Sequence, residues 1–339
     1  MKSNYRYIVK AFMAMAVIAG TTSCDDFLDR EPMSSISPET YYSTAAQLEA
    51  NLNDEYPNVL PSFGQWTYGI FGEDKGTDNQ IEVNANDRYT QDRWKVPHSE
   101  SDNWKFERIY RINFFLSEAL PKFGEDMSGS QNTISGSVAT IKHYIGEMYF
   151  LRAYEYFKKL QLFGDFPIIN QPLADEMEAL REASKRFPRN EVARFIISDL
   201  DKAYAYMSDV DMATTRINKD VAMLVKSRVA LFEATWLQNF KGTAFVPGGE
   251  GWPGASLHNN YQYPSGNIDN EVKYFLEQAV EASKLVADKY KGSLTENTGV
   301  LQQSADDPSN PYFDMFAQED LSDVKEVLLW RQYARGLST

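Results

Sequence analysis

Aromatic rings set among polar side chains on a long irregular stretch offer the clearest chemistry in this 339-residue sequence. Residues 57–103 keep no helical or strand period, and irregular segments of this length are uncommon unless they have a function. A sugar has an apolar C–H face on which a ring can stack, and hydroxyls that carboxylate, amide and guanidinium groups can bind. The stretch therefore predicts a ligand-binding surface, although the same rings could instead cover helices beneath them. The candidate binding residues are Trp66, Asp78, Asn79, Arg88, Tyr89 and Trp94.

A second stretch of the same kind spans residues 241–267 and carries six glycines among its polar and aromatic residues. Its candidate binding residues are Trp252, Tyr261 and Tyr263, for the same reason of ring stacking beside hydrogen-bonding groups. The alternative, a loop that packs on its own rings, stays open. Substitution of Trp252 separates the two interpretations, because a binding residue affects affinity and a packing residue affects stability.

Other site chemistries find little support in the residue patterns. The sequence has neither the G-x-S-x-G pattern of many hydrolases nor a phosphate-binding loop. His143 and Glu147 are four residues apart on a predicted helix, but a zinc site needs further ligands that the sequence does not place. Asp306, Asp307 and Asn310 could ligate calcium, yet a turn between prolines explains them as well. We therefore expect no enzyme activity, no cofactor and no metal.

Composition limits the class of partner. Lys and Arg number 34 against 48 Asp and Glu, which gives a net charge of −14, and no basic run is present. Such an acidic chain argues against nucleic acid as a partner. With 43% hydrophobic residues, the chain can bury one large core, or one core and a smaller unit.

The element that must position both loops is a helix predicted over about residues 134–163. Phe150, Tyr154 and Phe157 follow one helical line, and Met148 and Leu151 follow another. Two apolar faces on one helix indicate that it is buried between neighbouring helices. A glycine and a proline directly after residue 163 end it.

Further helices flank this central one. Residues 192, 196, 200, 203 and 207 are apolar at helical spacing, and in the last helix Val272, Leu276, Ala279 and Val286 are expected to face inward. Asn218 is the expected N-cap of the helix whose inward apolar stripe ends at Trp236, and Ser37, followed by Pro38, is the expected N-cap of the first helix. The predicted helices are residues 37–56, 104–120, 188–207, 218–236 and 269–290, and a strand is predicted over 326–333.

Several of these segments resemble one known family. Residues 146–167 match G-E-x-x-F-L-R-A-x-x-Y-F-x-x-x-x-x-F-G-D-x-P, which resembles the core helix of the SusD/RagB family. Trp104, Tyr110 and Asn113 fit its W-x5-Y-x2-N pattern, and residues 189–203 fit R-x-x-V-x-x-x-I-x-x-D-L-x-x-A. The resemblance implies a mostly α, tetratricopeptide-like helical-repeat scaffold with long irregular loops and minor β structure. It also implies that Asn113 is a structural bridge and that the long loops form the ligand platform.

The N-terminal residues predict export. Residues 1–23 have a basic start and a ten-residue apolar run that is too short to cross a membrane, as in a lipoprotein signal peptide. We expect lipidation at Cys24, although Thr21 replaces the usual leucine. Residues 24–36 form an acidic tether that resembles a surface-export signal. Residues 37–339 form the helical domain, which we expect to be truncated before the further lobe that family members carry.

The resemblance implies a non-catalytic lipoprotein anchored in the outer membrane and facing the cell exterior. It would bind a glycan, an oligo- or polysaccharide, and pass it to a SusC-like TonB-dependent transporter for uptake. Three alternatives stay open at this point. The same scaffold could bind peptides or another nutrient, as the RagB branch implies; it could be a glycosidase, if two carboxylates lie at the required separation; or it could be a helical adaptor without a ligand.

Overall fold

The computed structural model describes residues 41–61, 80, 103–124, 126–208, 212–301, 303–304 and 306–332. The chain divides into two units, residues 1–42 and 43–339. In the first unit only Tyr41 and Tyr42 are described, and their rings pack edge to face. All the other described residues belong to the second unit. In the part of the chain that the structure describes, no helix is both long and apolar enough to cross a membrane.

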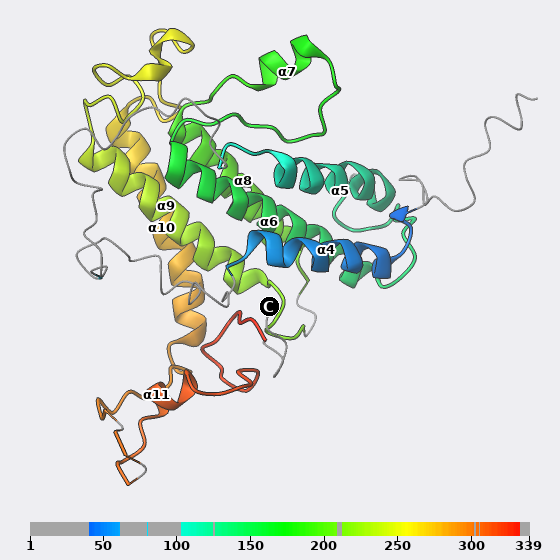
Figure 1. Cartoon of the computed structure of the whole chain (residues 1–339), viewed down its shortest axis with the longest axis vertical. Coiled ribbons are helices and arrows are strands. Elements are labelled where there is room, and N and C mark those ends of the chain that lie inside the picture. The colour runs from blue at the N-terminus through cyan, green and yellow to red at the C-terminus, as the bar shows by residue number, and fades with distance from the viewer. Residues whose placement is uncertain are drawn as a thin grey trace, which may run out of the picture. The chain divides into compact units, whose positions relative to one another are not determined.

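The second unit is built from helices (Figure 1), which confirms the mostly α scaffold. Its described residues form no β-strand, and isolated bridges join Thr44 to Ser135 and Phe166 to Phe187. The longer helices are α4 (Ala45–Val59), α5 (Glu107–Phe123), α6 (Val138–Phe163), α8 (Arg189–Tyr206), α9 (Lys219–Asn239) and α10 (Ile268–Tyr290). The short ones are α7 (Met177–Ala183), η3 (Pro253–Ser256) and α11 (Pro311–Met315).

Helix α6 is the buried centre, as its two apolar faces predicted. It packs against α4, α5 and α8, and 17 of its 26 residues are buried. A glycine in its middle allows a close contact with α8. A Cβ on Gly146 would lie 2.8 Å from the backbone nitrogen of Met207 and 2.9 Å from the carbonyl oxygen of Ala203. The end of α8 can therefore approach α6 at this point only where α6 has no side chain.

The helices α6, α8, α9 and α10 follow one another in antiparallel order, each packed on the next (Figure 1). The predicted stripe of α8 is confirmed, since its five apolar residues are all buried in this stack. In α10, Ala279 and Val286 are buried as expected. The prediction for Leu276 was wrong, because its side chain is 37% exposed and its neighbour Phe275 is buried in its place.

Ion pairs inside the stack explain the polar residues of the family pattern. Arg152 on α6 donates from Nε and NH2 to Asp199 on α8 at 2.7 and 2.9 Å. Its NH1 donates to the amide oxygen of Asn113 on α5, whose nitrogen donates to the Ile169 carbonyl. Asn113 is thus confirmed as a structural bridge. Removing one member of such a buried pair is strongly destabilising, so these residues hold neighbouring helices in register.

Two helix starts differ from the sequence prediction. Thr44 caps α4 through a capping box with Gln47, so a helix does not run unbroken over 37–56; Ser37, the expected cap, lies outside the described residues. The helix also continues past Pro57, because a proline in the last turn removes only one backbone bond. Helix α5 begins at Glu107, and Trp104 packs instead on Phe163 and Phe166.

Two further segments also differ. The stretch between residues 167 and 188, where the sequence predicted no helix, contains the short helix α7. The strand predicted over residues 326–333 is wrong for the described residues 326–332. There the backbone nitrogen of Trp330 donates to the Thr214 carbonyl, and the Leu328 carbonyl accepts from the side chain of Asn218. A loop and a helix cap therefore satisfy this backbone, and no strand ladder forms beside it.

Candidate functional site

The candidate site is the segment of residues 240–267, drawn in yellow in Figure 1. It joins the end of α9 to the start of α10, beside the end of α6 and the start of α8. Its turns depend on glycine. A Cβ on Gly249 would lie 1.9 Å from the Thr243 carbonyl oxygen, a distance that no side chain permits. Four helix ends thus support one compact loop.

A half-buried hydrogen bond joins this loop to the segment directly after α6. The indole Nε1 of Trp252 donates to Asp165 Oδ2 at 2.7 Å, and the backbone nitrogen of Arg189 donates to the other carboxylate oxygen at 2.9 Å. Burial raises the pKa of Asp165, and these two donors oppose that rise. Trp252 itself is only 5% exposed, so it joins the loop to the scaffold and offers little surface to a ligand.

An arginine links the same corner to α9. The Arg189 guanidinium donates to both carboxylate oxygens of Glu233 and lies 4.1 Å from the ring centroid of Trp236. Burial raises the pKa of Glu233, and the positive charge of Arg189 opposes this shift. Trp236 is followed by a row of rings, with Phe240 4.6 Å from Trp236 and Phe245 5.4 Å from Phe240.

The two tyrosines of the loop are also held by hydrogen bonds. The Tyr261 hydroxyl donates to the amide oxygen of Asn190 at 3.1 Å and accepts from its nitrogen at 2.9 Å. The Tyr263 hydroxyl donates to the Pro247 carbonyl at 2.7 Å. Burial raises the pKa of both hydroxyls, so both remain protonated donors. Ring centroids lie 5.6 Å apart for Trp252 and Tyr261 and 5.2 Å apart for Tyr261 and Tyr263.

The structure thus brings the three predicted residues of this loop into one packed row. Their polar atoms have partners within the protein, which favours a positioning role for them over direct contact. The other candidates, Trp66, Asp78, Asn79, Arg88, Tyr89 and Trp94, lie outside the described residues and stay predictions, as does lipidation at Cys24.

A cleft opens beside the buried Trp252. Its volume is about 650 Å³, and it lies between the end of α6, the residues before α8, and the loop. Phe245, 61% exposed, and Leu257 provide apolar surface at its rim. Arg186 also lines it, with its guanidinium 4.6 Å from the ring centroid of Trp104. The cleft therefore combines an exposed ring with a cation, which suits a ligand with an apolar face and polar edges.

A smaller hollow of about 360 Å³ lies on the other side of the loop, lined by Tyr261, Tyr263 and backbone of the glycine turns. Sequence reasoning missed the residues that give the larger cleft its open surface. Trp236 was interpreted only as part of an inward helical stripe, and Phe245 carried the same signal as the rings that were selected. No spacing in the sequence indicates Arg186.

Two other predicted clusters have structural partners. Nε2 of His143 lies 3.0 Å from the Ile217 carbonyl oxygen and 3.1 Å from Glu147 Oε1. Asp307 accepts from the backbone nitrogens of Gln303 and Ser304, and these bonds lower the pKa of its carboxyl. Among the described residues no group of three His, Cys, Asp or Glu is placed to hold a metal ion.

A family model described as starch-binding and associating with the outer membrane matches residues 26–231. The chain belongs to the SusD-like family. Two SusD-like proteins of Formosa agariphila are each 25% identical to it, over 71% and 63% of this chain. The matches cover 46% and 41% of those proteins, so the chain spans less than half their length.

Solved structures similar to the chain also include SusD-like proteins. A SusD-like carbohydrate-binding protein from Bacteroides vulgatus is 14% identical, with a TM-score of 0.44 over 76% of this chain and 47% of its own. A laminarin-binding SusD-like protein is 21% identical, with a TM-score of 0.29 over 39% of this chain and 26% of its own.

Proposed function

We propose that this SusD-like chain is a non-catalytic, cell-surface lipoprotein that binds a glycan and passes it to a SusC-like TonB-dependent transporter. The observation that carries the proposal is the match of residues 26–231 to a family described as starch-binding and associating with the outer membrane. Lipidation at Cys24 and an orientation toward the cell exterior belong to the same proposal, because the sequence before residue 36 has the pattern of an exported lipoprotein.

The cleft beside the 240–267 loop is the proposed glycan site within the described residues. Phe245 supplies an exposed ring for stacking on the C–H face of a sugar, and Arg186 supplies donors for its hydroxyls. The carboxylates nearest to it, Asp165 and Glu233, are already bound by Trp252 and Arg189. This arrangement supports holding a sugar and gives no reason to expect cleavage.

Affinity gels with the chain beginning at Asp25 test the proposal. Electrophoresis through gels that contain starch, laminarin or other neutral polysaccharides should retard the chain, and peptide pools should not compete. Retardation in the absence of any reducing-sugar release supports binding without catalysis. Retention on peptides alone, or measurable release of sugar, would reject the proposal in favour of a peptide-binding or hydrolytic protein. Co-purification with a TonB-dependent transporter from outer membranes tests the partner separately.

A further inference from the structure

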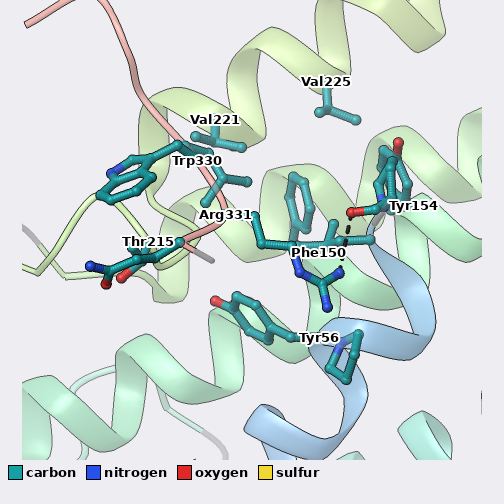
Figure 2. A pocket seen from close by; sticks show the side chains of 13 residues that line it. Tyr56, Phe150, Tyr154, Thr215, Val221, Val225, Trp330 and Arg331 are labelled. Atoms are coloured by element: carbon teal, nitrogen blue, oxygen red, sulfur yellow. Dashed lines mark hydrogen bonds between the residues drawn. The ribbon is translucent and has the colours of Figure 1, made fainter. Parts of the chain in front are cut away.

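A second cavity, of about 500 Å³, lies near the other end of α9 (Figure 2). Its walls come from the end of α4, the middle of α6, the start of α9 and the segment 329–332. Val225, which lines it, is 11 residues before Trp236 on the same helix, which places it about 16 Å along the axis from the cleft beside the loop. The two sites are therefore separate.

Four aromatic residues line it: Tyr56, Phe150, Tyr154 and Trp330. The Tyr56 hydroxyl donates to Glu147 Oε2 at 2.6 Å and accepts from the backbone nitrogen of Ile217. The indole Nε1 of Trp330 donates to Thr214 Oγ1 at 2.9 Å. Because these polar tips are bound within the protein, the faces shown in Figure 2 are available for apolar contact.

The remaining wall is also largely apolar. Phe150 and Tyr154 stack with their ring centroids 6.0 Å apart, and Val221 and Val225 extend this surface on α9. A glycan would leave most of its hydroxyls without partners on such a surface, which is costly. A volume of this size with a few polar groups is typical of a small-molecule site.

One charge lies at this cavity. Among its described lining residues, Arg331 alone carries a formal charge at neutral pH, and no carboxylate lines it. Its NH1 donates to the Pro61 carbonyl, the dashed line in Figure 2. A guanidinium has five N–H donors in a fork that fits a carboxylate, so it can serve more than one acceptor.

We propose that this cavity binds a small aromatic carboxylate, with its ring between Tyr56, Tyr154 and Trp330 and its carboxylate at Arg331. The apolar ring faces select the aromatic part, and Arg331, the only charged residue among the described lining residues, selects the anion. This inference does not depend on the glycan proposal, since it concerns a different set of residues and a different kind of ligand.

Calorimetric titration of the chain from Asp25 with naphthoate, and with the neutral naphthamide, tests the inference. Both should bind. Arg331→Gln should weaken naphthoate binding about tenfold, the loss expected for one hydrogen bond to a charged group, and should leave naphthamide binding unchanged. Val225→Trp should abolish binding of both by filling the cavity. Val280→Trp on the exposed side of α10 is the matched control and should bind like the parent.

Three outcomes would overturn the inference. They are the absence of binding by either probe, unchanged binding after Val225→Trp, and equal losses for both probes after Arg331→Gln. A dimer that Val225→Trp dissociates, with no probe bound, would identify the cavity as an interface between two copies instead. If Val225→Trp fails to fold by circular dichroism, Gln332→Trp blocks the same cavity from its exposed side and decides the result.

Discussion

Replacing Trp252 by Phe distinguishes an anchoring residue from a ligand-binding one. The change keeps a smaller aromatic ring but removes the 2.7 Å bond from Nε1 to the half-buried carboxylate of Asp165. A hydrogen bond to a charged group contributes about 1.5–3 kcal/mol, so the free energy of unfolding should fall by that amount. Glycan affinity should change little, because Trp252 is almost fully buried.

The pH dependence gives this prediction a second readout. Burial raises the pKa of Asp165 above its ordinary value of 3.8, while Trp252 and Arg189 oppose the rise. A carboxyl with a raised pKa contributes stability that is fully present below pH 3.8 and is lost as pH rises through the raised value. Without the hydrogen bond from Trp252, the pKa of Asp165 rises further, and more stability is lost as the pH rises. The Trp252→Phe variant should therefore be destabilised most at about pH 7 and least at about pH 3.

Denaturant unfolding at both pH values, in a double-mutant cycle with Asp165→Asn, measures the effect. The cycle should give a clear coupling energy between the two side chains, since they are in direct contact. Unchanged stability with lost glycan affinity would contradict the anchoring role. It would show instead that Trp252 contacts the ligand, as the sequence first indicated.

Three other changes test the scaffold. Gly146→Ala should destabilise by about 1–3 kcal/mol despite its better helix propensity, because its Cβ would meet the backbone of α8; Gly292→Ala, which meets no atom within 4 Å, is the control, and equal effects in denaturant unfolding would contradict this. Arg152→Met should cost about 3–5 kcal/mol by leaving Asp199 buried without its partner, and unchanged calorimetric stability would argue against a structural role for the pair. Burial alone would raise the pKa of Glu271, but hydrogen bonds from Arg194, Asn190 and Ser265 lower it below 4.5. Its stabilisation is thus present above pH 4.5 and lost as pH falls through the lowered pKa, so Glu271→Gln should flatten the acid side of the stability profile.

The helical scaffold could be predicted from the sequence because apolar spacing and helix-ending residues act locally. The two lines of apolar residues on α6, apart from the half-buried Tyr154, and the stripe on α8 correspond to buried faces. Helix starts were less predictable, because more than one residue near a helix start can act as its N-cap. Thr44 makes a capping box with Gln47 that the sequence signal at Ser37 and Pro38 obscured. The strand predicted near the end failed because high apolar content can also pack against a helix without a strand partner.

The site was predicted only in part, since ring content identifies a loop but not the direction of each ring. Trp252, Tyr261 and Tyr263 were predicted as binding residues and lie together in the folded loop, yet their polar atoms bind Asp165, Asn190 and the Pro247 carbonyl. These contacts join residues more than 15 positions apart, and no local pattern encodes them. Phe245 has the exposed ring that sugar stacking requires, and only the folded loop distinguishes it.

A glycan site in the cleft beside the 240–267 loop is tested most directly by calorimetry on Phe245→Ala. The titrant is the polysaccharide that retards the parent chain most in affinity gels. We expect about a tenfold loss of affinity, equivalent to ~1.4 kcal/mol, with an unchanged melting temperature. Phe316→Ala, at a ring that is 71% exposed elsewhere, should bind like the parent. Equal affinity of Phe245→Ala and the parent chain would contradict a site in this cleft and place glycan binding on other residues.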